Sequence, residues 1–181
     1  MGNRQLIKLA IVAFLLTAVM VLVGTLEDRQ EVTLKEGSYL LAGFNPEKVY
    51  GIYIQKGGET LMFKRKDESF VVSGDRESPV SNDQINRIVN SVARIRCDEK
   101  VTHDPRNHEA LGVAGGKESL VIRFFTESGK KMTGVIIGRD RPGSAGFYAR
   151  LEDEKQVYRS TDSYPPVSTN AADYIRKNLP R

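Results

Sequence analysis

Hydrophobic and polar residues alternate along several short stretches of this chain, a pattern typical of β-strands that bury one face. Residues 49–55, VYGIYIQ, show the alternation, and the glycine pair at 57 and 58 provides a turn into TLMFKRK. Neighbouring stretches lie close enough in the chain to pair as hairpins. The pattern predicts strands at residues 49–55, 60–66, 69–74, 119–127, 131–140, 147–153 and 156–162.

A spacing of three and four residues predicts a central helix that begins after Ser81. Its apolar stripe consists of Ile85, Ile88, Val89, Val92 and Ile95. The charges agree, because Asp83 near the start and Arg94 near the end both suit the helix dipole. Residues 170–179, NAADYIRKNL, predict a closing C-terminal helix, whereas residues 97–117 have no clear period and predict a loop.

The order of these elements is strands, helix, strands, helix. It predicts an α+β fold with a mostly antiparallel sheet built from hairpins, one central helix and one C-terminal helix. A chain of 181 residues is long enough to bury the core of one such domain.

An apolar segment precedes this domain. Residues 9–26 contain no charge and as a helix would be about 27 Å long, close to the roughly 30 Å of a bilayer's hydrocarbon core. Arg4 and Lys8 precede the segment, while Glu27 and Asp28 follow it, which predicts an N-terminus inside the cell. The exit sequence VLVGTLED has no A-x-A cleavage pattern, so we favour an uncleaved anchor over a cleaved signal peptide.

These features predict a single-pass protein of the cytoplasmic (inner) membrane. Residues 1–8 form the cytoplasmic N-terminus, 9–26 the transmembrane anchor, 27–43 a tether, and 44–181 an extracytoplasmic, periplasmic α+β domain.

Charge and cysteine content exclude several classes of function. Lys and Arg number 27 against 23 Asp and Glu, and segments such as KRKDE mix both signs, so no basic patch indicates nucleic-acid binding. Cys97 is the only cysteine, which excludes an intrachain disulfide and a cysteine-based metal cage. We expect Cys97 to be a packing residue rather than a nucleophile.

A glycine-rich stretch from Gly138 to Gly146 resembles part of a phosphate-binding loop. The position of the essential lysine is Ser144, and the following FYARL predicts a strand where a phosphate loop requires a helix. The stretch therefore favours a hairpin turn. We predict that this turn is a partner-binding loop, formed by Arg139, Arg141, Gly143, Gly146 and Tyr148.

No complete catalytic or metal-binding motif is present. His103 and His108, with Asp104 and Glu109 beside them, do not match the H-E-x-x-H spacing of zinc enzymes and predict a solvated loop. The sequence lacks the G-x-S-x-G of serine hydrolases. We expect no cofactor and no bound metal, although carboxylates that meet only in the fold would permit hydrolysis.

Several stretches of the chain resemble one bacterial family. The more specific of them are Leu111-Gly112-Val113 before a strand, then Ile137-Gly138, then Gly146 with Tyr148-Ala149-Arg150, and Val157-Tyr158. Over about residues 44–179, the chain is similar to the family called domain of unknown function 4340. The resemblance implies an extracytoplasmic domain, often associated with gliding-type or uncharacterised ABC transport systems, with no assigned enzyme activity.

Together these observations predict a non-catalytic, membrane-anchored accessory protein that binds an envelope or transporter protein. The alternatives are a membrane-tethered envelope hydrolase and a phosphate or nucleotide sensor.

Overall fold

A nine-stranded antiparallel sheet forms most of the body in the computed structural model, which describes residues 34–74, 77–140 and 146–175. The strand order is β4-β3-β2-β1-β6-β7-β8-β9-β5. The strands are β1 (Gly51–Lys56), β2 (Glu59–Lys66), β3 (Ser69–Val72), β4 (Ser78–Pro79), β5 (Glu99–Thr102), β6 (Leu120–Phe125), β7 (Lys131–Asp140), β8 (Phe147–Leu151) and β9 (Val157–Ser160). The mostly antiparallel sheet predicted from the hairpin pattern is therefore confirmed.

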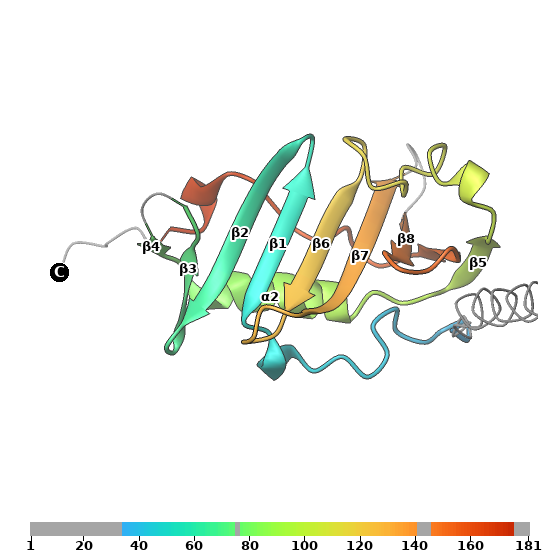
Figure 1. Cartoon of the computed structure of the whole chain (residues 1–181). Helices are drawn as coiled ribbons and strands as arrows, with labels where there is room; N and C mark the ends of the chain where they lie inside the picture. The colour runs from blue at the N-terminus through green and yellow to red at the C-terminus, as the bar shows by residue number, and fades with distance from the viewer. Residues whose placement is uncertain (1–33, 75–76, 141–145, 176–181) are drawn as a thin grey trace, which may run out of the picture. The chain divides into compact units, whose positions relative to one another are not determined.

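The central helix α2 (Asn82–Ala93) connects the two edges of this sheet. It leaves edge strand β4, passes behind the central strands in Figure 1, and leads to edge strand β5. The predicted stripe is the buried face of the helix, because Ile85, Ile88, Val89 and Val92 are all buried. The central helix is thus confirmed, and it covers one face of the sheet.

The main core lies between α2 and this face of the sheet. Alternate strand residues supply it: Ile52 and Ile54 from β1 oppose Phe63 and Leu61 of β2, as the antiparallel register requires. The described residues also form three short 3-10 helices, η1 (Pro46–Lys48), η2 (Pro105–Asn107) and η3 (Ala171–Asp173).

Residues 34–43, which the sequence analysis assigned to the tether, contribute to this core. Leu34, Leu40 and Leu41 are buried, and the compact body begins at Leu34. The Leu40 amide donates to the Ile95 carbonyl, and the Leu34 amide donates to the hydroxyl of Tyr158 on β9. The packed domain therefore extends ten residues ahead of the expected start at 44.

The predicted C-terminal helix is wrong. Among the described residues the segment forms only the 3-10 turn η3, capped by the Asn170 side chain, and Ile175 then bridges to Val80. Tyr174 is buried against Phe63 and exchanges hydrogen bonds with Ser168. These contacts attach the segment to Phe63 and to Val80, which follows β4.

The predicted loop at 97–117 also contains an element that the pattern missed. Residues 99–102 form β5, which pairs with β9 at the edge of the sheet. Its residues are exposed or half-buried, so no apolar alternation marks the strand.

The predicted membrane anchor at 9–26 lies outside the described residues. Within the ranges 34–74, 77–140 and 146–175, no helix is both long enough and apolar enough to cross a membrane.

Candidate functional site

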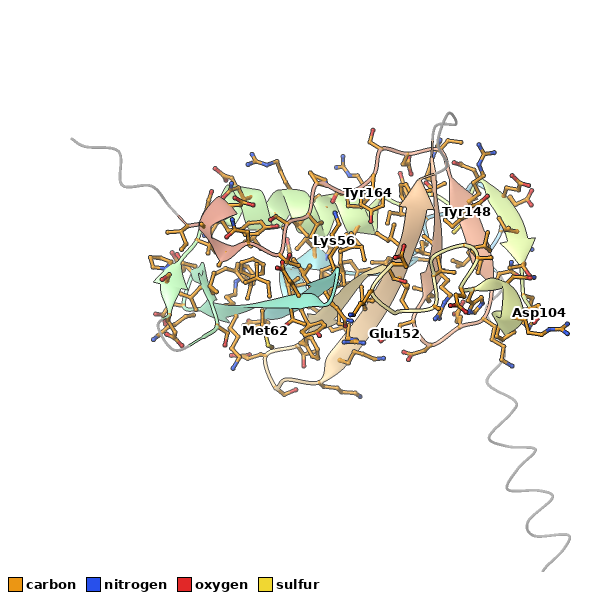
Figure 2. All side chains as sticks on the ribbon, turned by 90° about the horizontal axis from the view of Figure 1, so that it is seen from above. Lys56, Met62, Asp104, Tyr148, Glu152 and Tyr164 are labelled. Carbon is orange, nitrogen blue, oxygen red and sulfur yellow. The ribbon has the colours of Figure 1, made fainter. Side chains whose placement is uncertain are left out.

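A groove of about 620 Å³ lies on the face of the sheet opposite α2, over β1, β2 and the β6–β7 turn. Figure 2 shows Met62 and Glu152 on this side of the sheet, away from the helix. The groove is lined by Tyr50, Gly51, Met62, Lys64, Arg65, Asp67, Phe125, Thr126, Glu127, Ser128 and Gly129. It is therefore a hollow in a sheet face, built by strands that are fixed by pairing on both sides.

The floor of the groove is apolar. Gly51 pairs with Lys64 on one side and with Phe125 on the other, and a Cβ at Gly51 would lie 3.2 Å from the Phe125 Cβ. The absence of a side chain at Gly51 thus leaves room for the Phe125 ring. Met62 and Phe125 are both half-buried, so the floor retains apolar surface that a bound segment can cover.

The rim of the groove is charged with both signs. Lys64, Asp67 and Glu127 are exposed, and the two carboxylates belong to the turns that close the β2–β3 and β6–β7 hairpins. Carboxylates that act as general acids are usually enclosed, since burial keeps them protonated at neutral pH. Asp67 and Glu127 have no such enclosure, because both are exposed.

A network of charged side chains borders the same face. Arg123 on β6 donates from Nε and Nη2 to the Glu152 carboxylate, at 2.8 Å for Nε to Oε1, and stacks over the Tyr53 ring. Lys131 donates to both Glu152 and Asp153. The hydrogen bond from Arg123 is the main cause that holds the pKa of Glu152 below its ordinary value, with a further contribution from Lys131. The network joins β6, β7 and the turn after β8.

A second structural feature, which we call the latch, covers this face over β7 and β8. It consists of residues 111–113, which contact Gly138 of β7 and Arg150 of β8. A Cβ at Gly138 would overlap the Leu111 carbonyl oxygen, so glycine allows the loop to lie directly on β7. Val113 packs in a small cluster with Val121, Ile136 and Val157.

The Arg150 side chain attaches the latch to β8. Its Nε donates to the Val113 carbonyl at 2.8 Å, and its Nη1 donates to the carbonyls of Leu151, Glu152 and Glu154, each at 3.0 Å. Arg150 is buried, and this burial lowers the pKa of its guanidinium. The four carbonyls replace the water that the buried cation has lost.

The residues of the predicted partner-binding loop fall in three places. Gly146 has φ +110° and lies against the Ser160 carbonyl, and Tyr148 packs beside the Val113 cluster, so both have structural roles. Arg139 belongs to β7, whose backbone alone is described there, and Arg141 and Gly143 lie outside the described residues. The binding role of this loop stays a prediction.

Cys97 is fully buried, as expected of a packing residue. Burial, followed by the nearby Asp98 and Glu154, raises the pKa of its thiol to about 12. A thiol of this kind is not a nucleophile at neutral pH.

The two histidines lie in different environments. His108 is buried and donates from Nε2 to the Lys155 carbonyl at 2.9 Å, while His103 is exposed. In the part of the chain that the structure describes, no three His, Cys, Asp or Glu side chains are grouped as metal ligands.

One family model matches the sequence. It is described as a domain of unknown function, DUF4340, and covers residues 71–180, more than half of the chain. The chain belongs to this family. The matched DUF4340 region contains the latch, α2 and strands β5 to β9, so the residues that carried the resemblance serve mainly to build the fold.

The other comparisons add nothing to the DUF4340 assignment. No curated protein and no solved structure matches the chain. Strands β1 and β2, which form one wall of the groove, precede the matched region.

Sequence reasoning missed the groove because its residues are scattered over three strands and two turns. A weak signal was present, since Tyr53, Met62 and Phe125 fall on the face opposite the core residues of their strands. If those alternate positions are interpreted as a second apolar face of the sheet, rather than as core, they indicate the floor of the groove.

Proposed function

We propose that the chain is a non-catalytic accessory protein, anchored in the membrane with its body outside the cytoplasm, that binds an envelope or transporter protein. The groove over β1, β2 and β6 is the observation that supports binding. Its half-buried floor of Met62 and Phe125, with a rim of mixed charge, has the composition of a small protein-binding surface. The anchor rests on the apolar segment 9–26, and the link to ABC transport rests on the family.

Chain length supports a body held near the membrane. If residues 9–26 span the bilayer, only residues 27–33 separate that segment from the packed Leu34. Seven extended residues reach at most about 25 Å. The partner would then be a membrane protein or a protein close to the membrane surface.

Hydrolysis is less well supported than binding. Asp67 and Glu127 line the groove but are exposed at its rim. The sensor alternative depended on Gly138 to Gly146, of which Gly138 and Gly146 serve backbone packing.

Site-specific photocrosslinking in native membranes tests the proposal. A benzoylphenylalanine at Met62, in the full-length chain, should give a defined product with an envelope or membrane protein. The same group at Glu109, which is exposed and lies away from the groove lining, serves as the control. Equal products from both positions, or no product from Met62, would contradict the proposal.

A further inference from the structure

Arg65, at the end of β2, is held in an unusual position for a cation. Its guanidinium lies 5.5 Å from the centre of the Tyr50 ring and 5.4 Å from that of Phe70. Contacts of this kind with two rings fix the plane of the guanidinium and exclude part of its water. The side chain is therefore preorganised before any ligand binds.

The hydrogen bonding of Arg65 is incomplete. Its Nη1 donates to the Glu47 carbonyl at 3.3 Å, which is a long hydrogen bond. Its Nε is buried and has no hydrogen-bond partner, and no carboxylate among the described residues lies within ion-pair distance of the guanidinium. By contrast, Arg123, another half-buried arginine on this sheet, has a bidentate carboxylate partner.

A cleft of about 140 Å³ adjoins Arg65, between η1, β3 and α2. Val49, Phe70 and Val89 give it apolar walls, while Asn86 and Asn90 project from successive turns of α2. The volume is well below the roughly 300 Å³ at which cofactor and drug-like sites begin. It suits one side chain, with methylene groups against the apolar walls and polar atoms near Arg65 and the two amides.

We propose that the Arg65 cleft binds a carboxylate of the protein partner, supplied by a glutamate or aspartate in an acidic segment. The existence of that partner rests on the proposed function. A carboxylate accepts two parallel N–H bonds from a guanidinium, and the asparagine amides can donate to its oxygens. It supplies the anion that Arg65 lacks. Arg65 lines both hollows, which lie on opposite sides of the sheet, so one partner would occupy both only by passing round the sheet at Arg65.

The carboxylate of Glu47 opposes this binding. Glu47 is exposed and lines the cleft, so its negative charge repels an incoming anion. The Glu47→Gln substitution should accordingly strengthen binding, although it leaves the main-chain carbonyl that accepts from Arg65 in place.

The test is a titration of the full-length chain, in mild detergent, with N-acetyl-glutamate methylamide. The side-chain amide resonances of Asn86 and Asn90, which line the cleft and are present in every variant, are followed by nuclear magnetic resonance. We expect a saturable shift, with affinity reduced at least tenfold in Arg65→Met and increased in Glu47→Gln. The neutral glutamine analogue should give no saturable shift, since it cannot accept as an anion. Arg87→Met removes an exposed cation of α2 that does not line the cleft, so it should bind as the parent does.

Three outcomes would overturn the inference: an equal response to the glutamine analogue, unchanged binding in Arg65→Met, or binding of inorganic phosphate in preference to the glutamate probe. Arg65→Lys keeps the positive charge but not the planar guanidinium group. The thermal midpoint of this variant shows whether a loss of binding is caused by unfolding. A Met62 crosslink without carboxylate binding would refute this inference alone. Carboxylate binding without any crosslink would instead refute the proposed function.

Discussion

Gly138 and Arg150 fix the loop that covers β7 and β8, and they do so by opposite means. Gly138 contributes by having no side chain where the Leu111 carbonyl meets β7. Arg150 contributes by having a long, charged side chain that donates to four carbonyl groups. Both residues were noticed in the sequence as family markers, and the structure gives each a physical role.

The substitution Gly138→Ala should destabilise the fold by at least about 2 kcal/mol, because the added Cβ forces the loop backbone away from β7. The measurement is the free energy of unfolding in urea. The control is Gly116→Ala, where a Cβ meets nothing within 4 Å and the change should stay within about 0.5 kcal/mol. Equal effects at the two glycines would show that the latch does not depend on close packing.

At the scale of elements, strands are joined by side chains as well as by main-chain pairing. Glu152 connects β6 and β7 through Arg123 and Lys131, and its amide donates to the Gly134 carbonyl at 2.8 Å. The Glu152 side chain lies over Gly134, where a Cβ would contact it. The charged network therefore requires glycine at that position of β7.

This network predicts a pH dependence of stability. The folded pKa of Glu152 is lowered, so its contribution is complete above the unfolded pKa of about 4.3 and is lost as the pH falls through the folded pKa. Between pH 7 and pH 3, the urea midpoint of the parent should therefore fall further than that of Glu152→Gln. In Glu109→Gln, which changes an exposed glutamate, the fall should match the parent. Parallel curves for the parent and Glu152→Gln would contradict this role.

Sequence periodicity predicted those elements that have one buried face. The strands with a buried face and the amphipathic helix α2 were found because burial imposes a period of two or of 3.6 residues on the sequence. The edge strand β5 and the C-terminal segment were not found. Their conformations depend on β9 and Val80, which are distant in the chain.

For the whole molecule, the segment 34–43 closes the core beside β9 and α2. The Gly37 amide donates to the Cys97 carbonyl, and the Cys97 amide donates to the Ser38 carbonyl. Leu40 is 1% exposed and Leu34 is 8% exposed, so a segment with the composition of a tether is part of the fold.

A chain that starts at Leu34 should consequently fold cooperatively, whereas one that starts at Phe44 should not. The shorter chain loses the burial of three leucines, roughly 5–9 kcal/mol, which approaches the whole stability of about 5–15 kcal/mol expected of a domain. Circular dichroism during thermal unfolding distinguishes the two. Within the longer chain, Leu40→Ala should cost about 2–5 kcal/mol, and Tyr39→Ala, at a side chain 52% exposed, much less. A cooperative transition in the chain from Phe44 would refute this boundary.

The sequence by itself determined the class of the fold, the central helix, most strands and the family, because each leaves a local pattern of burial or a recognisable motif. It also predicted the apolar segment at 9–26 as an anchor, and that prediction stays open. Tertiary structure alone decided where the groove lies and that, among the described residues, no carboxylate lies within ion-pair distance of the Arg65 guanidinium. Gly51, Met62, Arg65 and Phe125 meet only through strand register, and register is set by pairing between segments far apart in the chain.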